Sequence, residues 1–307
     1  TEKDFVSEQK VILEERRMRT DDDPISLTSE QFSAALKLAT PYQDPVIGWE
    51  RDILNIKSSD MRQWYETWYE PNNAVIVVAG DVVADQVFEL ANKYFGKISP
   101  KKINKNKNLS PVPQLGKKVI SVKAKAKVPT LMMGIQVPSL KTAVKEDKGD
   151  LYALHLLSEI LTGGQSAIME KSLVREQQVA TSIRSSYDLF SKYDSSFVFF
   201  GTPADKSNVE NLEKAIYKSL LDIANNPISE GTLSSVKARV IAHNVYAIES
   251  PEDKAYLIGS LSSVGFSWED YIEFVDKIRK VSSKQIQGVV KKYFVEDKFT
   301  IAKLIPT

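Results

Sequence analysis

The 307-residue sequence contains no cysteine, only two histidines and no apolar run of membrane-spanning length. The absence of cysteine excludes disulfides and zinc sites that are built from thiolates. No stretch approaches the roughly 18 apolar residues that indicate a transmembrane helix. Acidic and basic residues nearly balance, at a net charge of +1, so nothing in the composition points to nucleic acid or an anionic membrane as a partner. The length favours a globular protein of two domains.

The chain begins at Thr1 and passes directly into a predicted helix over Asp4 to Arg19. Glu8 and Glu15 on this helix are seven residues apart and therefore share one face. Apolar residues flank them on both sides: Phe5, Val11, Ile12 and Met18. The other charges fall on the opposite arc, which we expect to face solvent: Lys10, Glu14, Arg16 and Arg17.

Two carboxylates within an apolar stripe need a partner, because burying an uncompensated charge is costly. One interpretation is that lysine or arginine residues from elsewhere in the chain form salt bridges with Glu8 and Glu15. The other is that one of the two acids binds a metal ion as an oxygen ligand while the other supports it from behind. The residues alone leave both interpretations open.

The rest of the chain alternates helices and strands, separated by proline, glycine and polar residues. In the first half we expect helices over 28–38 (capped by Thr28 or Ser29), 60–69 and 84–95, and a buried strand over 74–80. A linker rich in lysine, asparagine and proline follows at 98–118. In the second half we expect strands over 118–124, 130–136, 181–187, 195–202 and 299–305, and helices over 150–161, 209–225, 230–248, 251–263, 268–279 and 283–294.

An internal repeat relates the two halves. Residues 58–78 and 282–302 each comprise two serines, a helix that ends in tyrosine, a turn and an apolar strand, with equal spacing from serine to tyrosine. When the copies are aligned on the proline that follows each helix, Ser235 and Ala242 occupy the positions of the two acids, so the fold itself does not require them. The second copy is longer at its start, and we expect about a hundred further residues before Thr1. The chain would then be a fragment or a processed product.

Two weaker candidates for a site have simpler explanations. Gly163 and Gly164 lack the spacing and the lysine of a phosphate-binding loop, so we predict that they end a helix. His155 and His243 lie on apolar helix faces, where we expect hydrogen-bonded core histidines. His155 and Glu159 form an i, i+4 pair, but without a second histidine this pair is not a metal site.

Several segments together are similar to the pitrilysin/insulinase family of zinc peptidases, the inverzincins. They are SEQKVILEERRMRTDDDP, PYQDPVIGWERDI, SSDMRQWYETWYEPNNAVIVVAGD and KYFGKI in the first half and GGQSAIMEKSLVREQQ in the second. The resemblance covers essentially the whole chain. It implies an α/β (α+β) fold of two homologous domains, each a mainly antiparallel sheet packed against helices, at 1–99 and 118–307 with a linker at 100–117. The first domain would be truncated at its N-terminus.

The same resemblance implies roles for particular residues. Glu15 stands at the position of a zinc ligand, and Glu8 at that of a carboxylate that supports the site. Arg175 matches an arginine that positions the substrate carbonyl, but Ser182 stands where the family has its tyrosine partner. The HxxEH motif, which supplies two histidine ligands and the glutamate base, does not occur in the sequence, and the family would place it before Thr1.

These features predict a zinc metalloendopeptidase that acts on unfolded peptides. We expect this chain to be the zinc-bearing subunit of a heterodimer, inactive as 307 residues alone, with a homologous partner subunit that supplies the arginine and tyrosine pair. The alternative is a catalytically inactive peptidase-like scaffold or a peptide-binding subunit. Bacterial relatives of this size are often exported, so we favour the periplasm over the cytoplasm.

Overall fold

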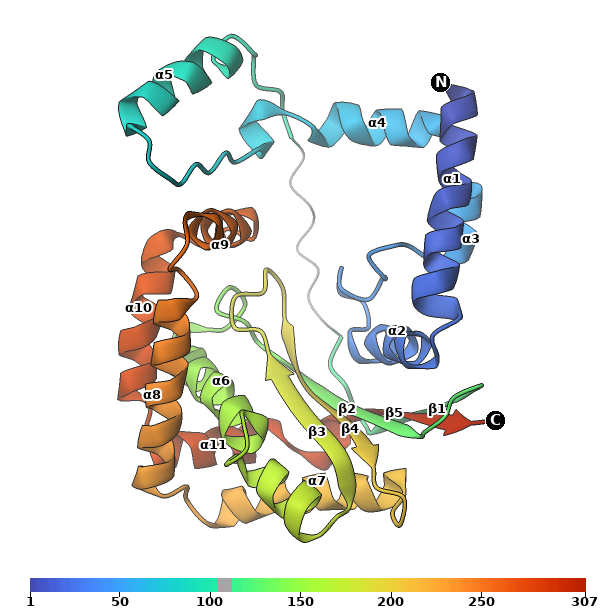
Figure 1. The fold of residues 1–307 in the computed structure, drawn as a ribbon, viewed down its shortest axis with the longest axis vertical. Coiled ribbons are helices and arrows are strands. Elements are labelled where there is room, and N and C mark those ends of the chain that lie inside the picture. The colour runs from blue at the N-terminus through green and yellow to red at the C-terminus, as the bar shows by residue number, and fades with distance from the viewer. Residues whose placement is uncertain (104–111) are drawn as a thin grey trace.

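A mixed sheet in the second half of the chain organises the fold (Figure 1). The computed structural model describes residues 1–103 and 112–307, and the predicted linker therefore lies partly outside the described residues. The strands are β1 (Lys118–Ala124), β2 (Thr130–Val137), β3 (Ala180–Tyr187), β4 (Ser195–Pro203) and β5 (Thr300–Pro306). They lie in the order β1-β5-β2-β4-β3, and only the β1–β5 pair is parallel. The predicted mainly antiparallel sheet packed against helices is confirmed.

Helices cover one face of this sheet and form the main core with it (Figure 1). Among its largest fully buried side chains are Phe197 and Phe199 of β4 and Phe299, just before β5. The helices of this half are α6 (Lys148–Thr162), α7 (Val209–Asn225), α8 (Glu230–Tyr246), α9 (Pro251–Ser263), α10 (Trp268–Lys280) and α11 (Ser283–Tyr293), and a π-helical segment spans Glu170–Glu176. Each of the six corresponds to a predicted helix, because the apolar residues of these segments recur at helical spacing.

A single helix from the first half, α2 (Pro24–Leu36), covers the opposite face of the sheet. Phe32 and Leu36 pack there against Met132 and Ala302. The helix begins four residues earlier than predicted, and neither Thr28 nor Ser29 caps it. Asp23 is the N-cap, and its carboxylate accepts a hydrogen bond from the Ser26 amide (2.9 Å). A proline at the first helical position suits this start, because its fixed φ fits the helix and its missing N–H would have had no partner.

The first helix, α1 (Glu2–Arg16), continues as a π-helical turn over Arg17–Asp21 and confirms the predicted element. Arg16, which we expected to face solvent, is instead its buried residue, with 5% of its surface exposed. Its guanidinium donates two hydrogen bonds of 2.8 Å to the Glu30 carboxylate on α2 and one of 2.8 Å to the Gly48 carbonyl. The prediction was wrong because periodicity shows which residues share a face of the helix but not which charged residue packs against that face.

The predicted strand over 74–80 is not formed. The remaining helices of the first half are α3 (Glu50–Asn55), α4 (Ser58–Trp68) and α5 (Ala84–Phe95). Between α4 and α5 the chain is extended, and Val75, Ile76 and Val78 are exposed. A strand needs a neighbour for its backbone hydrogen bonds, and no strand in the described part of the chain pairs with this segment. The apolar sides of α4 and α5 are exposed as well: Met61, Trp64, Tyr65, Phe88, Leu90, Tyr94 and Phe95.

Two smaller expectations concern α6. Gly163 is its C-cap, and the Gly163 amide donates to the Glu159 carbonyl (2.9 Å), which confirms that the glycine pair ends a helix. His155 is not the hydrogen-bonded histidine that we expected: its buried Nδ1 has no partner among the described residues, and its ring packs edge-on against Phe274 at 5.2 Å between centroids. In the ranges that the structure covers, no helix is both long and apolar enough to span a bilayer.

We expect Arg16→Met to destabilise the packing of α1 on α2, because it leaves the buried Glu30 carboxylate without its counter-charge. A broken buried pair typically costs roughly 3–5 kcal/mol, which would be measured as the free energy of opening in hydrogen exchange of α1 amides. Adding Glu30→Leu should recover much of the loss. Arg17→Met is the control, since Arg17 pairs with Glu14 at the surface. Unchanged exchange in Arg16→Met would contradict this role.

Acid should destabilise the protein through His155. Burial lowers the pKa of His155 below its ordinary value of 6.5, against the opposing influence of Glu159 and Asp188, while His243 adds to the lowering. As pH falls below about 6.5 the unfolded chain takes up a proton that the folded chain resists, so stability should decline. His155→Gln should flatten this acid limb in chemical denaturation curves recorded between pH 7 and 5. His243 is exposed, contrary to the core position that we expected, and His243→Gln should reduce the acid limb far less than His155→Gln, because it removes only the smallest of these influences.

Candidate functional site

Glu8 and Glu15 both lie on α1, as predicted, but neither is buried. Glu8 is exposed, and 41% of the Glu15 side chain is accessible. Glu15 forms a salt bridge with Arg19, one turn further along the chain (2.9 Å between Nη1 and Oε1). The apolar stripe around them is likewise open, with Val11 and Met18 exposed. The expected burial is therefore wrong for the described residues, and the cation beside Glu15 comes from its own chain segment.

Glu15 borders a cavity of about 440 Å³ between α1 and the loop before α3. The cavity is lined by Glu15, Arg19, Thr20, Ser26, Glu30, Pro45, Val46 and Ile47. The position of Glu15 is set by its neighbour Arg16, whose buried ion pair fixes the end of α1 against α2. Near the middle of α1, the side-chain amide of Gln9 donates to the Ile53 carbonyl (2.8 Å) and ties α1 to α3. The carboxylate is thus held at a polar opening by a fixed helix.

These residues do not form a zinc site on their own. Across residues 1–103 and 112–307, no group of three or more histidine, cysteine, aspartate or glutamate side chains could hold a metal ion. A zinc site needs three or four protein ligands, usually with nitrogen or sulfur among them. Glu15 has the chemistry of one such ligand, a carboxylate at an accessible cavity, and its Arg19 partner would have to move away. The described residues therefore fit one ligand rather than a complete site.

Arg175 lies apart from the two acids, at the end of the π-helical segment that packs on β3. Its exposed guanidinium donates a hydrogen bond to the Gln165 carbonyl. Ser182, at the position of the expected tyrosine, is exposed on β3. No hydrogen bond or salt bridge among the described residues links Arg175 to α1, so its substrate-binding role stays a prediction.

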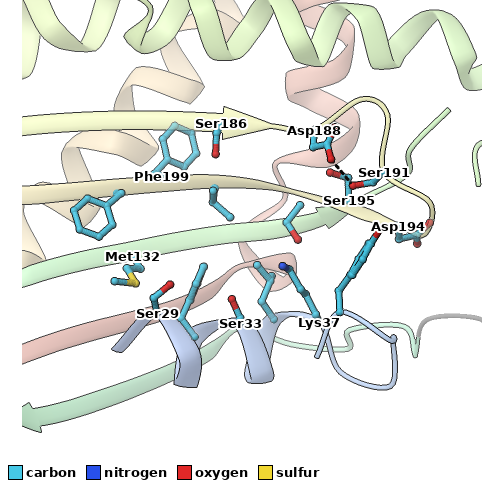
Figure 2. A pocket seen from close by; sticks show the side chains of 16 residues that line it. Ser29, Ser33, Lys37, Met132, Ser186, Asp188, Ser191, Asp194, Ser195 and Phe199 are labelled. Atoms are coloured by element: carbon cyan, nitrogen blue, oxygen red, sulfur yellow. Dashed lines mark hydrogen bonds between the residues drawn. The ribbon is translucent and has the colours of Figure 1, made fainter. Parts of the chain in front are cut away.

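A second cavity, of about 460 Å³, lies between α2 and strands β3 and β4, where the sequence predicted no site (Figure 2). Ser29 and Ser33 of α2 and its C-cap Lys37 line it, at intervals of four residues. This spacing places them on one side of the helix and is the signal that could have indicated the cavity. Around them lie Ser186, Asp188, Ser191, Asp194, Ser195 and Ser196 of β3, β4 and their connection, together with Tyr42 and several apolar side chains.

Among the described residues Lys37 is the one cation that lines this cavity, and its nitrogen points into the space between the helix and the strands (Figure 2). Burial lowers its pKa below the ordinary value of 10.5, and no salt bridge to Lys37 is formed among the described residues. Asp188 accepts hydrogen bonds from the Phe190 amide (2.9 Å) and the Ser191 hydroxyl (2.8 Å). The cavity thus has a lysine on the helix side and acidic groups near the β3–β4 turn.

Comparison with known proteins identifies the family of this chain. Residues 55–240 match the domain described as "Peptidase M16 inactive domain". The zinc protease PqqE of Helicobacter pylori is 28% identical over 263 residues, which are 83% of this chain and 57% of that protein. This chain therefore spans little more than half the length of PqqE.

Solved structures have the same fold as this chain. The crystal structure of a protease from Helicobacter pylori has a TM-score of 0.90 and 26% identity, covering 100% of this chain and 73% of that one. A peptidase M16 inactive domain from Pseudomonas fluorescens has a TM-score of 0.85 and 16% identity, covering 100% and 71%. The fold and the family predicted from the sequence segments are confirmed. This chain therefore belongs to the M16 family of zinc peptidases, and the part that matches the family is its inactive-domain type.

Proposed function

We propose that this chain is part of a zinc metalloendopeptidase and supplies one metal ligand, Glu15. The observation that carries the proposal is the accessible Glu15 carboxylate at a cavity, on a helix fixed by the buried Arg16–Glu30 pair. The name of PqqE as a zinc protease and its greater length support the proposal. The remaining ligands and the general base would come from an HxxEH motif outside these 307 residues, so the chain alone would be inactive.

In this proposal the two acids have different tasks. Glu15 would hold zinc, which when bound supplies a Lewis acid and an activated water. Glu8, two turns earlier on α1, would orient the site without touching the metal. Arg19 would release Glu15, since an exposed pair between neighbouring helix residues is weak.

A second candidate function is a catalytically inactive scaffold or peptide-binding subunit. The match to an inactive-domain type over 55–240 favours it, as does Ser182 in place of the tyrosine. A scaffold has no use for a metal ligand at residue 15. The two candidates therefore differ in what the Glu15 carboxylate does.

Substitution of Glu15 distinguishes these candidates. Intact-mass spectrometry of the purified protein first shows whether a second polypeptide with HxxEH accompanies the chain. In that assembly Glu15→Gln should abolish both the bound zinc, measured by metal analysis, and peptide hydrolysis. Glu8→Gln should weaken zinc binding by roughly 10–100-fold. Glu14→Gln, at an exposed position on the same helix, should change neither. A Glu15→Gln assembly that retained zinc and turnover would contradict the role of Glu15 as a metal ligand.

We further propose a heterodimer with a homologous subunit that carries the complete arginine and tyrosine pair. Arg175 would then contribute little in this chain, because the short Ser182 side chain does not extend as far as a tyrosine hydroxyl would. Light scattering after gel filtration should give the mass of two different subunits, with peptidase activity only in that fraction. Arg175→Ala should leave the turnover of the assembly within about twofold of the unmodified one. An active monomer would contradict the heterodimer.

The compartment is proposed on the same resemblance to exported bacterial relatives. We place the protein in the periplasm rather than the cytoplasm, and the cysteine-free composition is compatible with either.

A further inference from the structure

The cavity beneath α2 contains more polar groups than its own contacts satisfy. Ser196 Oγ has no exposed surface and no hydrogen-bond partner among the described residues, and the same is true of Gln136 Nε2. Gln136 and Ser196 are direct partners across β2 and β4, so both side chains point to the same face of the sheet. That face is the one on which α2 packs through Met132 and Val198. Ser196 lines the cavity and Gln136 lies next to it on the same face, so the sheet wall of the cavity is polar at this point.

The charges indicate what kind of ligand this is. Lys37, the C-cap of α2, lines the cavity, and its ammonium lies 5.8 Å from the centre of the Tyr42 ring without an ion-pair partner among the described residues. Because burial of an ammonium is unfavourable, an anion beside it would be stabilised. Asp188 and Asp194 line the same cavity, and Figure 2 shows them at the end nearest the β3–β4 turn. Neither forms a salt bridge with Lys37 within the part of the chain that the structure describes. One cavity therefore presents a cation and two carboxylates at separate places.

The space is sufficient for a small molecule. Its volume of about 460 Å³ lies within the roughly 300–1,000 Å³ that is usual for ligand pockets. Serine hydroxyls from both walls, Ser29 and Ser33 on α2 and Ser195 on β4, can donate to or accept from a peptide unit.

We propose that this cavity binds a small zwitterion, either a free amino acid or a short peptide with both termini free. Its carboxylate pairs with Lys37, and its ammonium lies against Asp194 and Asp188. Ser29 and Ser33 of α2 provide the neighbouring hydrogen bonds. The inference concerns binding alone and does not rest on the proposed peptidase activity or on zinc.

The test is isothermal titration of the full 307-residue chain with trialanine, with its C-terminal amide and with its N-acetyl form. Free trialanine should bind, and each capped form should bind about tenfold or more weakly, because each loses one charge-assisted contact. Alanine is titrated in parallel: tighter binding of trialanine assigns the site to peptides, and tighter binding of alanine assigns it to amino acids. No binding of either at millimolar concentration overturns the proposal and leaves the cavity to water.

Substitutions then place the ligand. Lys37→Met should weaken the binding of free trialanine about tenfold but leave the already weak binding of its amide unchanged, since the same contact cannot be lost twice. Asp194→Asn should behave in the same way toward the acetylated form. Lys145→Met and Asp205→Asn, at exposed positions elsewhere, serve as matched controls and should bind like the unmodified chain. Unaltered thermal unfolding of Lys37→Met shows that the variant folds, and equal loss of acid and amide binding would refute the assignment.

Discussion

The packing of α2 on the sheet is the contact on which the whole first half of the described chain depends. Phe32 and Leu36 bury their side chains against Met132 and Ala302, and this is the apolar cluster that joins the two halves. The α1 helix is attached to α2 in turn through the Arg16–Glu30 pair. Burial of these apolar side chains drives the association, because its free energy is roughly proportional to the apolar area removed from water. The Arg16–Glu30 ion pair then fixes the orientation of α1 relative to α2. The Glu15 cavity and the Lys37 cavity both lie beside this one helix.

The comparison of the two repeated units shows how much of the fold could be predicted. Helix, turn and apolar segment are encoded locally, and α4 and α5 appear within two residues of their predicted ends, as do α11 and β5. Whether the apolar segment becomes a strand is not local. β5 has β1 and β2 on either side, whereas residues 74–80 have no partner strand among the described residues. A prediction made from apolar character alone could not tell these situations apart.

The candidate site was only partly accessible to sequence reasoning, for a related reason. Glu8 and Glu15 were found because they break an apolar pattern, and the family was identified from segments that the comparisons support. The burial of Arg16 and the exposure of Glu15 depend on what faces α1, which periodicity does not contain. The Lys37 cavity is formed by residues that are more than a hundred positions apart, and each of them is unremarkable in its own segment.

The position of β5 has a consequence for synthesis of the protein. This strand lies between β1 and β2 in the sheet, yet it follows both of them far along the chain, and the Lys118 amide donates to the carbonyl of Phe299 (2.9 Å). The sheet cannot be completed until residues 300–306 have been synthesised, and until then β1 and β2 lack the strand that lies between them. Pairing between strands that are far apart in the sequence is slow, and a strand with an unpaired edge is prone to aggregation. Nascent chains of this protein should therefore depend on a chaperone until β5 has been synthesised.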